Sequence, residues 1–223
     1  MAAVLFMGMG RALLGLVIVL AAVACQYSGP TAKGNPVTAE SIALRSGDAS
    51  GLQRCGGSGD VEAVLRGEKA RDPMAYNLNA TEWEQWKSQG ASDAYFAVYG
   101  RTAADCDALS VSGAGAPSGG LMAALVVKFK SEAIAARTYG SKSTILGFGP
   151  RDIAFIMLVG GSVMTGSDTG LGPRSVIGSG SAAGTSYYFA FWQNNVFDSF
   201  FTAYDLPSAD ARGAANKMNH GIR

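Results

Sequence analysis

The stretch SYYFAFWQNNVFDSFFTAY, residues 186–204, gives the strongest indication of the fold. Two aromatic segments, residues 186–192 and 196–204, flank the polar triplet 193–195, and asparagine tolerates the positive φ of a tight turn. We therefore predict an antiparallel β-hairpin. Because successive side chains on a strand point to opposite faces, this hairpin presents large apolar groups on both of its faces.

The order of strand, short turn and alanine-rich helix occurs three times along the chain. The strands are predicted at residues 94–99, 121–129 and 196–204, and a helix with a polar cap follows each of them. Shorter strands at residues 162–165 and 174–179 flank a turn-rich segment. The predicted fold is α+β, a two-layer sandwich built from repeated strand-turn-helix units. Its sheet is expected to be mostly antiparallel, with the helices packed on one face.

Two further helices are predicted before these units. Asp60 is an N-cap that predicts a helix over the residues that follow it. Thr81 and Glu84 form a capping box that predicts the start of a second helix, which Gly90 ends.

The N-terminus has the features of an export signal. Arg11 precedes thirteen small or apolar residues, 12–24, which span only about 20 Å as a helix, less than the ~30 Å hydrocarbon core of a membrane. The run ends in AVAC, residues 22–25, which resembles the lipobox of bacterial lipoproteins. This resemblance implies that residues 1–24 are a lipoprotein signal peptide and that Cys25 carries the lipid. Secretion without lipid and an uncleaved anchor helix are the alternatives.

The remaining cysteines fit an exported protein. Residues 25–50 are rich in Gly, Ser, Pro and Ala, which predicts a flexible tether, so the α+β domain is expected over residues 51–223. If Cys25 is lipidated, Cys55 and Cys106 are left, and an oxidising compartment favours a structural disulfide between them. A redox or catalytic thiol is the alternative, but neither cysteine has a neighbouring His or a Cys-x-x-Cys spacing.

Charge and composition exclude several classes of function. Once Arg11 leaves with the signal peptide, 17 basic and 17 acidic side chains remain. A neutral chain lacks the cationic surface that nucleic-acid binding needs. His220 is the sole histidine and is expected at the exposed end of the last helix. We therefore expect no metal site, no cofactor and no catalytic constellation.

Asp198 interrupts the aromatic strand of the hairpin. A buried carboxyl group at this position would have a raised pKa and could act as an acid. The favoured interpretation is an edge position that is open to water or paired with a nearby Arg.

The aromatic hairpin and the apolar run at residues 153–159 could together form a binding surface. We expect this run to fold over the hairpin as an internal cover, with Trp192 beneath it. The alternatives are a cavity for a hydrophobic ligand and a contact with the membrane or an envelope protein. The candidate residues are Phe155, Tyr187, Phe189, Phe191, Trp192 and Phe200.

Three marks connect the chain to a known class of protein. They are GLQRC at residues 51–55, VKFKSEA at residues 127–133, and the late aromatic hairpin. With these marks, residues 51–220 resemble bacterial extracytoplasmic lipoprotein domains of uncharacterised function. In architecture they are also distantly similar to the extracytoplasmic sensor domains of bacterial serine/threonine kinases, which are disulfide-bonded α/β sandwiches. The resemblance implies a binding role and assigns no site residue.

Together these observations predict a lipid-anchored, non-catalytic binding or sensor module on the outer face of the bacterial cytoplasmic membrane. Its expected partners are the membrane, through Cys25, and a small hydrophobic ligand or an envelope protein. The alternative is a cell-envelope hydrolase that uses carboxylates which the sequence does not assign. A buried carboxylate pair in a cleft would favour the enzyme, and an apolar cavity without such a pair would favour the binding module.

Overall fold

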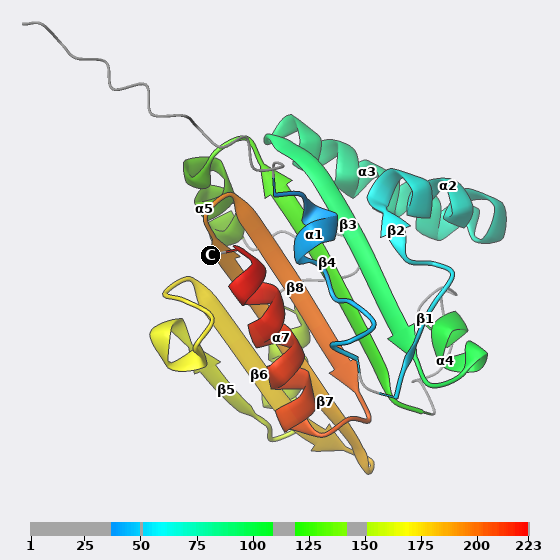
Figure 1. Cartoon of the computed structure of the whole chain (residues 1–223), viewed down its shortest axis with the longest axis vertical. Coiled ribbons are helices and arrows are strands. Elements are labelled where there is room, and N and C mark those ends of the chain that lie inside the picture. Colours follow the sequence, from blue (N-terminus) through cyan, green and yellow to red (C-terminus); the bar gives the residue numbers. More distant parts are fainter. Residues whose placement is uncertain (1–36, 50, 109–118, 142–150, 223) are drawn as a thin grey trace, which may run out of the picture. The chain divides into compact units, whose positions relative to one another are not determined.

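A computed structural model describes residues 37–49, 51–108, 119–141 and 151–222. Its centre is an antiparallel sheet in the order β1-β3-β4-β8-β7-β6-β5, with β2 also paired to β3 (Figure 1). The strands are β1 (Gln53–Arg54), β2 (Gly59–Asp60), β3 (Ala91–Gly100), β4 (Leu121–Phe129), β5 (Ser162–Thr165), β6 (Ser175–Ala182), β7 (Thr185–Asn194) and β8 (Phe197–Tyr204). The helices are α1 (Ala39–Ile42), α2 (Val61–Arg71), α3 (Pro73–Ser88), α4 (Ala103–Ala108), α5 (Glu132–Ser141), α6 (Arg151–Leu158), the 3₁₀ turn η1 (Gly166–Thr169) and α7 (Ser208–Ile222).

The strands lie where the apolar segments predict them. β4 and β5 have the predicted bounds, and β7 pairs with β8 as an antiparallel hairpin. Asn195 lies in the turn of this hairpin with a φ of 50°, a conformation that asparagine adopts more readily than most residues. The three strand-turn-helix units are β3 with α4, β4 with α5, and β8 with α7.

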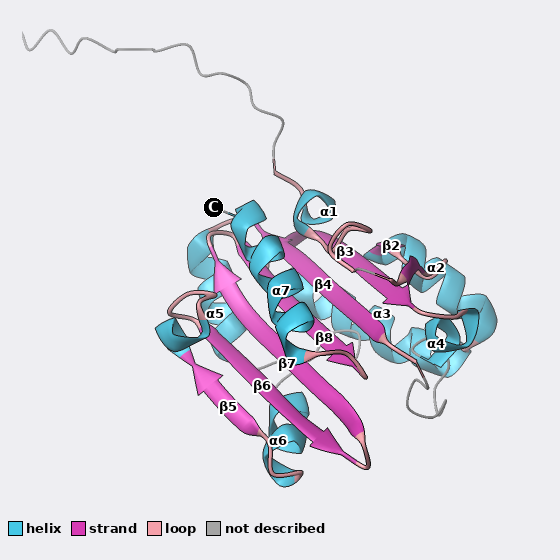
Figure 2. Ribbon diagram, turned by 60° about the horizontal axis from the view of Figure 1, so that its bottom comes forward, coloured by secondary structure: helices cyan, strands magenta, loops and turns pink. Residues whose placement is uncertain are grey.

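Helices cover both faces of the sheet. α1 and α7 pack on one face, against Trp192 and Phe201, whereas α2, α3 and α5 pack on the other, against Leu125 and Phe200 (Figure 2). The α+β class and the antiparallel sheet are confirmed, but the expected placement of the helices on one face is wrong. The reason is that nearly every side chain of β4 and β8 is buried, so both faces carry apolar surface that must be removed from water.

Helix α3 begins at Pro73 and not at Thr81, so the predicted capping box is wrong. The Asp72 carboxylate accepts hydrogen bonds from two backbone amides of the first turn, and Pro73 occupies the first turn, where its missing amide costs nothing. Thr81 lies in the middle of the helix, where its hydroxyl donates a hydrogen bond to the carbonyl of Asn77 at 2.7 Å.

Part of the segment expected to be a tether belongs to the domain. Ala39, Ile42 and Leu44 are buried in the cluster that α7 covers, and the Ala39 amide donates to the Asp93 carboxylate at 2.8 Å. The compact unit therefore begins at residue 36 rather than at residue 51, because these side chains complete the core. The predicted signal peptide and Cys25 lie outside the described residues. No helix in the described ranges is long and apolar enough to cross a membrane.

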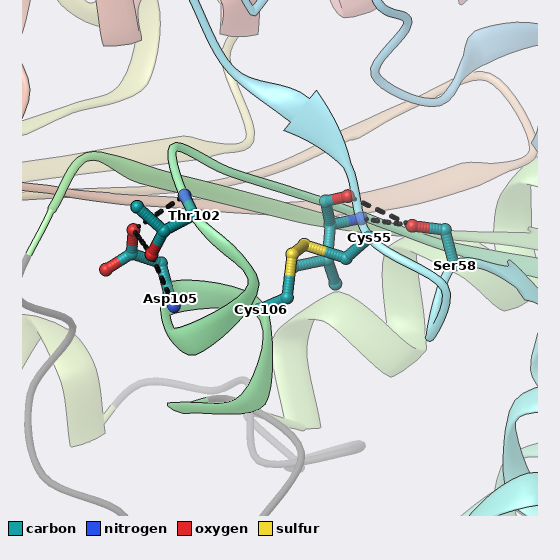
Figure 3. The surroundings of a disulfide bond; sticks show 6 residues. Cys55, Ser58, Thr102, Asp105 and Cys106 are labelled. Atoms are coloured by element: carbon teal, nitrogen blue, oxygen red, sulfur yellow. Dashed lines mark hydrogen bonds between the residues drawn. A yellow bond between two sulfur atoms is a disulfide. The ribbon is translucent and has the colours of Figure 1, made fainter.

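A disulfide joins Cys55 to Cys106, which confirms the predicted pairing (Figure 3). The Cys55 amide donates to the carbonyl of Val98 on β3 at 2.8 Å. Close to Cys106, the Asp105 carboxylate accepts from the amide and the hydroxyl of Thr102, at 2.9 and 2.7 Å. The disulfide therefore ties α4 to a segment that is hydrogen-bonded to β3, and the bonds between Thr102 and Asp105 close the start of α4.

Candidate ligand-binding site

The beginning of β6 presents side chains of decreasing size to α5 and α6. The residues on this face are Arg174, Val176 and Gly178, because every second residue of a strand points to the same side. A Cβ atom on Gly178 would lie 3.2 Å from side-chain atoms of Ile153 and Ile156, so the glycine lets α6 rest directly on the sheet. Next to Val176, residues of α5 and of α6 border a common space.

A cavity of 640 Å³ occupies this space. Its floor is Val176 and Phe191, which are cross-strand partners on β6 and β7. The volume lies within the range of small-molecule binding sites, and most of the lining side chains are apolar. The lining residues are Tyr139, Gly140, Ile153, Ala154, Met157, Thr165, Gly166, Pro173, Arg174, Ser175, Val176 and Phe191.

The outer surface of α6 extends this apolar character. Met157 lines the cavity and is 65% exposed, and the adjacent Leu158 is 85% exposed. The ring of Phe155 is 38% exposed and meets Tyr187 edge-on, with the ring centroids 5.3 Å apart. A cluster of large, solvent-exposed apolar side chains beside an apolar cavity is typical of a binding surface.

Arg174 adds a positive charge to the lining of the cavity. Its Nη1 donates to Oε1 of Gln193 at 2.8 Å, and Gln193 is itself buried. The Glu132 carboxylate on α5 lies 3.7 Å from the same nitrogen, and both partners are about half exposed. An exposed ion pair of this length contributes little, so the guanidinium can exchange Glu132 for another anion.

Tyr139 belongs both to the cavity wall and to the interior behind it. Its ring packs on Phe191, with the centroids 4.4 Å apart. Burial, assisted by the charge of Asp198, raises the pKa of Tyr139 to about 12, so the phenol is protonated at neutral pH. It can therefore donate a hydrogen bond.

Asp198 is fully buried on β8, between Val127 of β4 and Gln193 of β7. Neither of its carboxylate oxygens has a hydrogen-bond partner among the described residues. Burial raises the pKa of Asp198 to about 8, so the group is largely neutral at pH 7. The expected edge position or pairing with an Arg is wrong, because β8 lies at the centre of the sheet.

The structure separates the six aromatic residues expected to form one surface. Phe191 lies in the floor of the cavity, and Phe155 and Tyr187 contact each other beside it. Phe189 and Phe200 are buried, and Phe200 stacks on Phe191.

Trp192 points to the opposite face of the sheet. It belongs to the buried cluster that contains the inner side of α7, so α7 covers it. The expectation that residues 153–159 cover Trp192 is wrong. These residues are mostly α6, which packs on the other face, because Tyr187 and Phe191 alternate with Trp192 along β7.

The sequence interpretation missed Arg174 and Tyr139. Arg174 follows a turn rich in glycine and precedes an apolar strand, so a charge at the beginning of a strand was the available signal. Tyr139 carried no signal, since a tyrosine on a helix is compatible with core, surface or site.

Among the described residues, Arg174 and Tyr139 are the titratable groups that line this cavity. No carboxylate is present among its described lining residues, and the described ranges contain no cluster of three metal-ligating side chains. His220 is exposed in the last turn of α7, as predicted.

Comparisons with known proteins place the chain in no family. No family model matches it, and no curated protein matches it. One solved structure, the extracellular domain of PknH from Mycobacterium tuberculosis, aligns with a TM-score of 0.36 and 10% sequence identity. The alignment covers 60% of this chain and 66% of that domain, just under two thirds of the latter's length.

Proposed function

We propose that this protein is a non-catalytic extracytoplasmic module that binds a small, mainly apolar ligand between α5 and α6. The observation that carries the proposal is the 640 Å³ cavity with its apolar floor of Val176 and Phe191. The disulfide between Cys55 and Cys106 supports the compartment, because such bonds persist in oxidising environments.

The chemistry of the lining favours binding over hydrolysis. Arg174 is the charged side chain among the described lining residues, and these residues supply no carboxylate pair of the kind a cell-envelope hydrolase needs. Asp198 is not among them.

Filling the cavity is expected to weaken ligand binding. Ala154 on α6 lines the cavity and is exposed, so Ala154→Trp places an indole in the binding space without disturbing the core. We expect the affinity for Nile red, a neutral apolar dye, to fall about tenfold or more in a fluorescence titration.

Ala209→Trp is the matched control for this variant. Ala209 is an exposed alanine of α7, on the opposite face of the sheet and outside the described lining, so its replacement should leave dye affinity unchanged. Equal loss in both variants, or no dye binding by the unmutated protein, would contradict the proposed binding site.

A lipid anchor at Cys25 completes the proposal and places the domain on the outer face of the cytoplasmic membrane. We expect Cys25→Ser to move the protein from the detergent phase to the aqueous phase in phase partitioning. The reason is that each buried methylene of a lipid chain contributes about 0.8 kcal/mol. If the serine variant partitions with detergent as before, residues 1–24 are acting as an uncleaved anchor helix.

A further inference from the structure

We propose that the ligand of this cavity is an amphipathic acid, with its carboxylate on Arg174 and its apolar chain between α5 and α6. The inference rests on the proposed function and adds the chemical class of the ligand. Its basis is a single charged side chain, Arg174, among described lining residues that are mostly apolar.

The guanidinium of Arg174 is already oriented for a carboxylate. Gln193 accepts a hydrogen bond from one of its nitrogens at 2.8 Å, and the Nε2 of Gln193 donates to the carbonyl of Asn195, which fixes the amide. A neutral acceptor restrains the arginine without neutralising it. The planar fork of an arginine then matches the two oxygens of a carboxylate.

Glu132 occupies the position that a ligand carboxylate would take. Its Oε1 lies 3.7 Å from Arg174, beyond the distance of a good charge-assisted hydrogen bond. The pair lies at the surface, where such contacts contribute little to stability. A ligand anchored by its chain can therefore displace Glu132 at small cost.

The rest of the lining suits the other half of such a ligand. Ile153, Met157, Val176 and Phe191 provide apolar contact along the cavity. Tyr139 is protonated at neutral pH, so it adds no negative charge that would repel an acid. A cationic ligand would be repelled by Arg174, and a neutral one could accept a hydrogen bond from it but would gain no charge-charge attraction.

Titration of the full chain with decanoate, decanol and decylamine tests the ligand class by calorimetry. The three probes share one apolar chain and differ in the charge of the head group. We expect decanoate to bind about tenfold more tightly than decanol, because a charge-assisted hydrogen bond to Arg174 contributes about that much affinity. Decylamine should bind most weakly, because its charge has the same sign as that of Arg174.

Two variants test whether Arg174 binds the head group of the ligand. Arg174→Gln should weaken decanoate about tenfold and leave decanol unchanged, whereas Glu132→Gln should strengthen decanoate severalfold because its competitor is removed. Arg137→Gln is the control, since Arg137 is an exposed arginine of α5 outside the described lining.

The outcomes separate the two proposals. Equal affinities for decanoate and decanol, or tighter binding of decylamine, would overturn the acid and leave the apolar site standing. If none of the three probes binds, both proposals are overturned. A loss of decanoate affinity in Arg137→Gln equal to that in Arg174→Gln would show long-range attraction in place of a contact.

Discussion

Asp198→Asn is expected to remove much of the pH dependence of stability between about pH 4 and pH 8. The folded protein holds Asp198 with its pKa raised from 3.8 to about 8 by burial. Well below pH 3.8 the carboxyl is protonated in both the folded and the unfolded state. As the pH rises toward 8, the unfolded chain ionises freely while the folded chain cannot, so the folded state loses stability.

The expected effect is large. Each pH unit within this window costs the wild type up to about 1.4 kcal/mol, which accumulates to roughly 4 kcal/mol at pH 7. Asparagine has nearly the same shape and does not ionise, so it avoids this loss. Urea unfolding should therefore give nearly equal stabilities for the two proteins near pH 4 and a variant more stable by several kcal/mol near pH 7.5.

Asp205→Asn is the control for this experiment. Asp205 is exposed just beyond the same strand and has a φ of 50°, which asparagine tolerates. Its variant should keep the pH profile of the wild type. Parallel profiles for wild type and Asp198→Asn would show that Asp198 ionises normally and is not sealed in the core.

Trp192→Ala is expected to cost about 3–5 kcal/mol of stability, as truncation of a core tryptophan does. The side chain is 0% exposed and lies in the cluster between the sheet and α7. Its indole nitrogen has no hydrogen-bond partner among the described residues, so the loss is one of packing and burial. Denaturant unfolding measures the cost.

Phe155→Ala distinguishes between α6 and α7, the two helices that could cover Trp192 on the hairpin. Phe155 belongs to α6 on the opposite face and is partly exposed, so its truncation should cost about 1 kcal/mol. An unchanged unfolding midpoint for Trp192→Ala would mean that α7 does not seal the tryptophan, and that a partner or ligand covers this face.

Local signals were sufficient for much of the fold. The apolar run of β4 and the asparagine turn between β7 and β8 specify their structure within a few residues, because strand periodicity and turn conformation depend on neighbours in the chain. The pairing of Cys55 with Cys106 followed from the number of cysteines that remain if Cys25 is lipidated.

The helix boundaries show where such signals compete. Thr81 and Asp72 are both acceptable N-caps, and the chain uses Asp72 because Pro73 follows it. The prediction of a tether was wrong for a different reason. The apolar segment around Ala39 and Ile42 is too short to show the hydrophobic periodicity that would predict a buried helix.

The candidate site depended on tertiary pairing. Alternation along β7 assigns Phe191 and Trp192 to opposite faces, but it does not say which helix covers which face. Arg174, Tyr139 and Phe191 meet because β6 pairs with β7 in one register and α5 packs across β7. Asp198 is buried because β8 pairs with strands on both sides.

The composition and order of local segments therefore specified the strands and the hairpin of this chain. The three-dimensional pairing specified the two-sided core, the cavity and the presence of Arg174 in its lining. The physical reason is that turn conformation and side-chain alternation are properties of a few adjacent residues. Burial and long-range contact depend on the summed free energy of the whole fold.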